Sequence, residues 1–369
     1  MAFAFCALQH DATQKEVCHD RPSRTPCPVA PPRRPRAARR RRAWRLWLGR
    51  GGAPAGREDI EIVGVSGASA GAINGAAVVA GYATEGAAGA KAALERLWGH
   101  VADASPLAPL DVGAMGGPFF EPLLRRSLDI AKLSSRYVAP FLPGVRDMRA
   151  LRQAVAESID LDFLARQTRL PFYVAATHIA SGSARLFTGE DVTLDALMAS
   201  ACLPELFAAV EIEGEQYWDG GFTANPALEP LLTEAIGATD MMIVQITPFT
   251  VEDVGGSVGE VMRRVSDISF NACLRRDLRA LSEIQDVARA ETSRDPRMRA
   301  IARVNLHLLS PPPQLAGPSG TSKVDTRWSV LQDLREMGRA QAEEWLAAHR
   351  ETLGRASSFK GLPEDMMRP

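Results

Sequence analysis

A serine between two glycines is the clearest chemical feature of this sequence. Residues 60–77 read IEIVGVSGASAGAINGAA, which places Ser69 between Gly67 and Gly71 in a G-x-S-x-G pattern. The β-branched run before the serine and the small residues after it predict a strand, a very tight turn and a helix. Such a turn strains the serine backbone, exposes its hydroxyl and aims the positive end of the helix dipole at it. The pattern alone could arise by chance in a chain rich in Gly and Ala, but its place between strand and helix favours a nucleophile.

A serine nucleophile needs a base, and two arrangements are open. One is a triad, in which an acid orients a histidine, and the other is a dyad, in which a carboxylate acts directly on the hydroxyl. The histidines that follow the serine are His100, His178, His307 and His349. None of them lies in a late loop, where an α/β-hydrolase triad has its histidine, so the triad is the less favoured alternative.

Asp219 is the favoured carboxylate. It lies in the stretch YWDGGF, where a short predicted strand ends and Gly220 and Gly221 follow. Two glycines remove all side-chain bulk after the acid, which permits unusual backbone angles and the close approach of another chain segment. A carboxylate so placed can lie beside a hydroxyl on a neighbouring loop. The alternative interpretation is an ordinary Asp-Gly hairpin turn.

The elements that must position these residues alternate between strand and helix from residue 58 onward. We expect strands at residues 60–65, 171–177, 184–188, 241–246 and 304–309. We expect helices at residues 70–80, 88–98, 148–158, 193–201, 258–290 and 328–348. This order predicts a mostly parallel sheet covered by helices on both faces.

Bulk composition narrows the function classes. The chain has 369 residues and a net charge of −1, so its overall charge favours no nucleic-acid partner. Its five cysteines form no C-x-x-C pair, so no structural zinc site is expected. No apolar run is long enough for a transmembrane helix. We expect a cytoplasmic protein, with peripheral contact at a membrane as a further hypothesis.

The first 57 residues differ in composition from the rest. They contain the tract PPRRPRAARRRRAWRLWLGRGG, and no strand or helix period organises them. We expect a disordered Arg/Pro-rich leader at 1–57, a hydrolase domain at 58–350 and a C-terminal tail at 351–369. The sharp change near residue 58 also suggests a gene-model artefact. A basic nucleic-acid-binding arm is a remote alternative that rests only on residues 33–45.

The serine and aspartate motifs together resemble those of the patatin-like phospholipase family. The stretch ASACLPELFAAVEIEGEQYWDGGFTANPAL, at 199–228, is also similar to the family's approach to its aspartate. The resemblance covers roughly residues 60–346. It implies a three-layer α/β/α fold in which Ser69 is the nucleophile and Asp219 the proton acceptor. The implied reaction is hydrolysis of acyl esters, usually of lipids, through an acyl-enzyme, with no metal or organic cofactor.

One expected part of the family's site is missing from the sequence. The family's glycine-rich oxyanion loop follows its first strand, about thirty residues before the serine motif. Here that window, residues 28–45, contains no glycine and no apolar strand. We therefore expect the N-terminal strand and the oxyanion loop to be absent. This leaves open a second hypothesis, a catalytically impaired protein of the same fold that binds lipid or a partner.

Two further segments bear on lipid contact. Residues 101–145 are broken by prolines and carry scattered Phe, Leu and Met, which suits a lipid-facing cap over the serine. An ordinary insertion packed on the core explains the same pattern equally well. The long helix predicted at 258–290 carries several arginines that would suit either anionic lipid or plain solvation.

Overall fold

The computed structural model describes most of the chain after residue 59 and one strand near its start. The described residues are 2–10, 60–104, 148–204, 206–233, 235–251, 258–290, 293–312 and 326–362. For residues 2–10, 258 and 259 only the backbone is described. The Arg/Pro-rich residues 11–59 and the proline-broken residues 105–147 lie outside the described residues. The expectations for the leader tract, the oxyanion window and the lipid-facing cap therefore concern residues outside the description.

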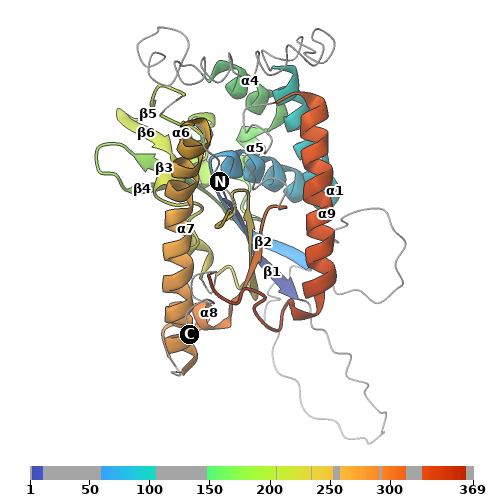
Figure 1. Cartoon of the computed structure of the whole chain (residues 1–369), viewed down its shortest axis with the longest axis vertical. Coiled ribbons are helices and arrows are strands. Elements are labelled where there is room, and N and C mark those ends of the chain that lie inside the picture. The colour runs from blue at the N-terminus through green and yellow to red at the C-terminus, as the bar shows by residue number, and fades with distance from the viewer. Residues whose placement is uncertain are drawn as a thin grey trace, which may run out of the picture.

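The described strands form one eight-stranded sheet at the centre of the molecule (Figure 1). Its linear order is β5-β6-β3-β2-β1-β7-β8. Strand β4 also pairs with β3 but is not part of this linear order. The strands are β1 (Ala2–His10), β2 (Ile60–Ala68), β3 (Phe172–His178), β4 (Ala184–Thr188), β5 (Val210–Ile212), β6 (Glu215–Asp219), β7 (Asp240–Gln245) and β8 (Asn305–Leu309). The expected strands are all present within a few residues of their predicted bounds.

The prediction of a mostly parallel sheet is wrong, because the sheet is mixed. Only the β2–β3 and β7–β8 pairs are parallel, and the other pairs are antiparallel. Short hairpins cause part of this difference. Glu213 and Gly214, both with positive φ, form the two-residue turn that reverses the chain between β5 and β6. The rest comes from β1, which runs antiparallel to both of its neighbours.

The prediction of a missing N-terminal strand is also wrong. Strand β1 consists of residues AFAFCALQH and lies between β2 and β7 in the middle of the sheet. Residues 2–10 of the expected disordered leader are therefore part of the fold. A short unbroken apolar run is typical of a strand with neighbours on both edges. The Arg/Pro tract that follows dominates the composition of the segment and hides this signal.

Helices cover the sheet, and Figure 1 shows α7 along one side of it and α9 along the other. The helices are α1 (Ala70–Asp103), α4 (Arg149–Ser158), α5 (Leu161–Arg166), α6 (Leu194–Ser200), α7 (Val258–Ala290), α8 (Pro296–Arg303) and α9 (Trp328–His349). The predicted bounds of the 258–290 helix are confirmed. The two helices predicted at 70–80 and 88–98 are one run, α1, with a kink at Glu85 and Gly86. Among the described helices, none is long and apolar enough to cross a membrane.

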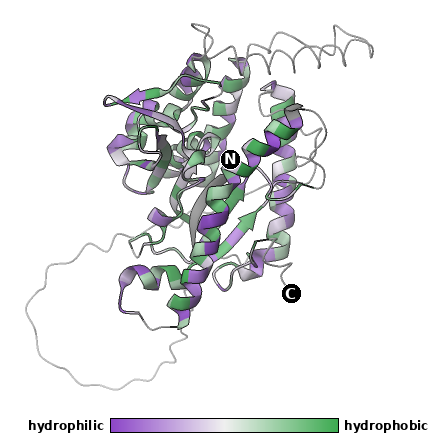
Figure 2. Ribbon diagram, turned by 60° about the vertical axis from the view of Figure 1, so that its left-hand side comes forward, coloured by the Kyte–Doolittle hydropathy of each residue, from purple (hydrophilic) through white to green (hydrophobic). Residues whose placement is uncertain are grey.

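Two clusters of buried apolar side chains hold these layers together. The first joins β2, β3, α1 and α6, and it includes Ile73, Val174 and Leu197. The second lies among β7, β8 and α7, and it includes Met241 and Leu274. Figure 2 shows hydrophobic and hydrophilic residues alternating along the outer helices, as expected where one helix face packs on a core.

The chain after α9 folds back onto the edge of the sheet. The short helix η6 (Arg350–Thr352) follows α9 directly. The Phe359 amide then donates to the Leu306 carbonyl of β8 at 3.0 Å, and Leu362 is buried in the second cluster. Residues 351–362 of the expected tail therefore pack against the sheet.

Candidate active site

The predicted strand–serine–helix turn is present. Strand β2 ends at Ala68, Ser69 follows, and α1 begins at Ala70. Ser69 has φ 58° and ψ −133°, a conformation that residues other than glycine rarely adopt. Its carbonyl accepts bonds from the Ala72 and Ile73 amides, at 2.9 and 3.3 Å, which ties it into the first turn of α1. The N-terminus of α1, with the positive end of the helix dipole, therefore lies at the serine.

The serine side chain was expected to be exposed, and this expectation is wrong. Ser69 is only 1% exposed. Part of the reason is the end of α6, which packs against the turn. The Ser69 amide donates to both the carbonyl oxygen and the Oγ atom of Ser200, at 3.1 and 3.0 Å.

Gly67 shows how closely the strand and the helix approach each other. A Cβ atom at this position would lie 2.5 Å from the carbonyl oxygen of Gly71. Contacts under about 3 Å are not found for real Cβ atoms, so any side chain here would force the backbones apart. The glycine on the strand side of the serine is therefore required by the packing of α1 on β2.

Asp219 is the last residue of β6 and is fully buried. Its amide donates to the Cys202 carbonyl at 2.8 Å, and its own carbonyl accepts from Thr177 Oγ1 at 2.7 Å. Its carboxylate Oδ1 accepts from the Gly221 amide at 2.8 Å. Backbone and side chain are thus held by three different segments, which fixes the direction of the carboxylate.

The two glycines after Asp219 begin the short helix η3 (Gly220–Phe222), so the simple hairpin interpretation is wrong. A Cβ atom on Gly220 would lie 2.0 Å from the Ala175 carbonyl oxygen of β3. A Cβ atom on Gly221 would lie 2.4 Å from the ring of Phe270 on α7. The glycine pair therefore allows the chain after Asp219 to pass between β3 and α7.

The sheet register brings Ser69 and Asp219 to the same point of β3. Ala68, just before the serine, pairs with Ala175 on one side of β3. Asp219 pairs with Ala176 on the same side, because β4 occupies the other side of β3 over residues 173–177. Strands β2 and β6 therefore meet end to end along one side of β3, and Ser69 and Asp219 lie where the two strands meet. The sequence places these residues 150 positions apart, and β3 is the element that brings them together.

The histidines of the triad alternative are engaged elsewhere. The His100 ring contacts Ser158 Oγ at 2.9 Å, at the far end of α1 from the serine. His178, the last residue of β3, contacts Ser181 in the β3–β4 turn and Glu215 at the start of β6, at 2.8 Å each. The His349 ring contacts the Trp345 ring within α9, with the two ring planes tilted at 52°.

His307 is a buried structural residue. Its Nε2 contacts Asp240 Oδ1 at 2.8 Å, and its Nδ1 contacts Ser358 Oγ at 2.9 Å. Burial raises the pKa of Asp240, but hydrogen bonds outweigh that effect and hold the pKa below its usual value. Those bonds come from His307, Thr239, the Gly354 amide and Asn305. The group locks the C-terminal segment onto β7 and β8.

Two buried cysteines lie close to the site. Cys273 on α7 donates to the Phe222 carbonyl at 3.2 Å, and burial raises the pKa of its thiol. Cys202 donates to the Ala208 carbonyl at 3.0 Å. Within the described ranges, no group of three or more His, Cys, Asp or Glu side chains could hold a metal ion.

Comparison with known protein families identifies the class. Residues 42–232 match the patatin-like phospholipase family, and this range contains both Ser69 and Asp219. The match covers more than half of the chain, so the protein belongs to the patatin-like phospholipase family. The family implies an α/β/α fold and serine acyl hydrolase activity in general, typically on lipids. A search of curated proteins found no match.

Proposed function

We propose that this protein is a serine lipid acyl hydrolase of the phospholipase A or esterase type, with Ser69 as nucleophile and Asp219 as proton acceptor. The observation that carries the proposal is the register on β3, which sets Ala68, the residue before Ser69, at Ala175 and Asp219 at Ala176 on the same side of that strand. The strained turn at Ser69 and the buried, oriented carboxylate of Asp219 support it. The family's general activity points in the same direction.

The proposed reaction has two halves. In the first, Ser69 Oγ bonds to the acyl carbonyl carbon while its proton passes to Asp219, and the ester C–O bond breaks as that proton moves to the leaving alcohol. In the second, water attacks the acyl-enzyme, its proton passes to Asp219, and the Ser69 oxygen is released with a proton as the carboxylic acid departs. Bonds and protons in these two half-reactions balance without a cofactor.

Negative charge develops on the substrate's carbonyl oxygen in both halves of the reaction, and hydrogen-bond donors must stabilise it. Loss of one such donor typically raises the activation free energy by about 3–4 kcal/mol. The positive end of the α1 dipole, at Ser69, supports the proposal on this point. The glycine-free window at 28–45 lies outside the described residues. A protein of the same fold that binds lipid without cleaving it therefore remains the competing function.

One experiment separates these two functions. Purified protein is incubated with a fluorophosphonate probe and, separately, with p-nitrophenyl acyl esters. We expect covalent labelling and ester turnover in the wild type, and neither in Ser69→Ala. A folded wild-type protein that takes no label would contradict the hydrolase and favour the lipid-binding protein.

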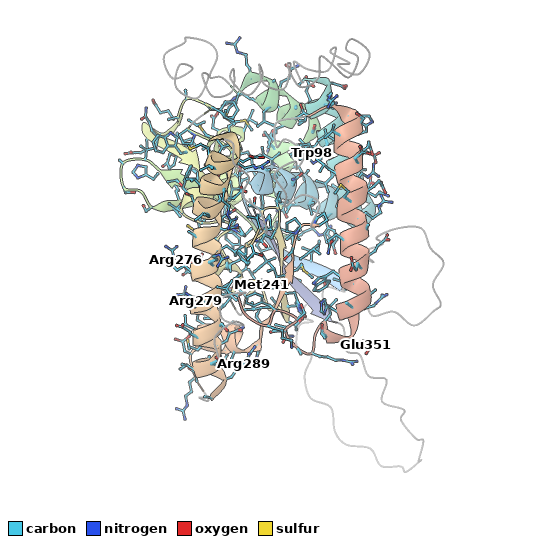
Figure 3. All side chains as sticks on the ribbon, in the orientation of Figure 1. Trp98, Met241, Arg276, Arg279, Arg289 and Glu351 are labelled. Carbon is cyan, nitrogen blue, oxygen red and sulfur yellow. The ribbon has the colours of Figure 1, made fainter. Side chains whose placement is uncertain are left out.

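We also infer that α7 faces the lipid interface. Val261, Val265 and Ile268 are 45%, 51% and 54% exposed, and their spacing puts them on one face of the helix. Arg276 and Arg279 extend outward further along the same helix (Figure 3). An apolar patch followed by basic residues suits the surface of an anionic bilayer. The inner face of α7 packs on η3 through Phe270, so this surface covers the aspartate side of the site.

A further inference from the structure

Ser200, at the C-terminal end of α6, is a fully buried residue with an unusual set of bonds. Its Oγ accepts from the Ser69 amide at 3.0 Å and donates to the Ala175 carbonyl at 2.6 Å. Its carbonyl oxygen accepts from the same Ser69 amide at 3.1 Å. One residue therefore gives two acceptors to a single amide and also anchors itself to β3.

The amide that Ser200 accepts from belongs to Ser69, the residue with the strained backbone conformation. A non-glycine residue held in a sparsely populated conformation costs about 1–3 kcal/mol and persists only when its surroundings over-determine it. The carbonyl side of Ser69 is held by the first turn of α1. The amide side is held by Ser200, so the two together determine the direction in which the Ser69 side chain leaves the backbone.

The same turn of chain also holds Asp219. The Cys202 carbonyl, two residues after Ser200, accepts the Asp219 amide at 2.8 Å. The Ala175 carbonyl that receives the Ser200 hydroxyl is also the group that a Cβ atom on Gly220 would meet first. Residues 200–202 therefore contact the backbones of both Ser69 and Asp219, and movement of this turn would change the separation of the two.

We propose that Ser200 is a positioning residue, which fixes the Ser69 hydroxyl relative to Asp219 by holding the Ser69 backbone. The inference rests on the hydrolase function proposed above and adds a residue to it. Ser200 touches neither substrate nor reacting atoms in this role. It acts through the amide of Ser69, and its loss should slow the chemical step and leave substrate binding largely intact.

The matched control lies at the other end of the same helix. Thr193 caps α6, and its Oγ1 accepts from the Ala196 amide at 3.2 Å. Thr193→Ala removes one hydroxyl and its hydrogen bond to the backbone but touches neither Ser69 nor Ala175, whereas Ser200→Ala removes one hydroxyl and its bonds to both. A merely structural role for Ser200 would make the two variants alike in rate once their thermal stabilities are taken into account.

The test compares wild type, Ser200→Ala and Thr193→Ala at a temperature well below the lowest unfolding midpoint. The measurements are the second-order rate constant of fluorophosphonate labelling and the kcat and KM for a p-nitrophenyl ester. We expect kcat and the labelling rate of Ser200→Ala to fall about 10- to 100-fold, as a misplaced nucleophile would. KM should change less than about twofold, because only the chemical step is affected. Thr193→Ala should keep the wild-type rates.

Two results would overturn the inference: wild-type rates in Ser200→Ala, or an equal loss in Thr193→Ala. If Ser200→Ala does not fold, Ser200→Cys carries the test, since it keeps the size of the side chain and weakens its bonds, and an unchanged rate would again contradict the role. Failure of the proposed function looks different. In that case the wild type itself takes no label, and both proposals fall together.

Discussion

The Nε2 atom of His307 lies 2.8 Å from Oδ1 of Asp240, and both side chains are completely buried. The Gly354 amide donates to both carboxylate oxygens of Asp240, at 2.9 and 3.0 Å. These bonds favour the charged carboxylate more than burial disfavours it, so the pKa of Asp240 lies below its usual value. The pair therefore links stability to pH at a point remote from Ser69.

We predict that Asp240→Asn destabilises the fold at neutral pH by about 2–4 kcal/mol, because it leaves buried donors poorly matched. A carboxyl whose pKa is lowered on folding contributes stability above its unfolded pKa of about 3.9 and loses it as pH falls through the folded value. The difference in the free energy of unfolding between wild type and variant should therefore become smaller below about pH 4. Urea unfolding at neutral and acid pH measures it.

Asp162 provides the control for this experiment. It pairs with Arg166 at 3.9 Å on the surface of α5, and its side chain is 85% exposed. Exposed ion pairs contribute about 1 kcal/mol or less, so Asp162→Asn should have little effect at either pH. A loss in Asp240→Asn that is no larger than in Asp162→Asn would contradict the importance of the buried pair.

Asp219→Asn should remove ester turnover without unfolding the protein. The amide is close in size to the carboxylate, but it cannot accept the serine proton, and general-base catalysis is typically worth about 10²–10⁴-fold. Ester hydrolysis and circular dichroism check the two parts of this prediction. His178→Asn is the comparison variant, since His178 bonds to Ser181 in the β3–β4 turn and to Glu215 on β6. Activity that survives in Asp219→Asn and disappears in His178→Asn would favour a histidine base.

Gly220→Ala should be strongly destabilising, because the new Cβ atom would lie 2.0 Å from a backbone oxygen, that of Ala175. Either β3 or the chain after Asp219 would have to move, and we expect a loss of about 2–4 kcal/mol. Gly99→Ala is the matched control. Gly99 lies in α1, and a Cβ atom there would meet nothing within 4 Å. This variant should instead gain about 0.5–1 kcal/mol from helix propensity. Thermal unfolding of both variants tests this prediction. Similar shifts of the unfolding midpoint in the two variants would contradict the close approach of Gly220 to β3.

A charge on the outer face of α7 should weaken lipid binding. We predict that Val265→Asp reduces co-sedimentation with anionic phosphatidylglycerol vesicles several-fold, since it places a carboxylate in the apolar patch. Val287→Asp is the control, because Val287 is 55% exposed on the same helix but lies far from the patch along it. Equal binding by both variants and the wild type would place the lipid-facing surface elsewhere.

The local parts of the site could be predicted from the sequence. The turn at Ser69 is determined by residues within a few positions of it, so the strand, the turn and the helix follow from one short pattern. The same holds for the 258–290 helix, whose apolar spacing runs its whole length. The chain after Asp219 is different. Its glycine pair fits both a hairpin and a close approach, and only the position of β3 decides between them.

The features that depend on contacts between residues distant in the sequence could not be predicted, and the physical reason differs from one feature to the next. The direction of β1 against β2 and β7 depends on the path of the chain between them, which no local pattern contains. Ser200 carries no local signal, because a serine among small residues cannot be recognised as part of a site until its neighbours in space are known. Its importance comes from Ser69, 131 positions away in the sequence. A fully buried hydroxyl at a helix end is the signal to look for in related chains.

The docking of residues 354–362 has a consequence for how the protein is made. Asp240 receives a backbone donor 114 positions later in the chain. A ribosome therefore completes β7 long before it supplies the groups that satisfy the Asp240 carboxylate. Until Gly354 is available, the Asp240 carboxylate lacks its backbone donor, and until Ser358 is available the His307 Nδ1 atom lacks its partner. Closure of this segment should therefore be a late step of folding, and a chain truncated before Gly354 should be a preferred substrate for chaperones.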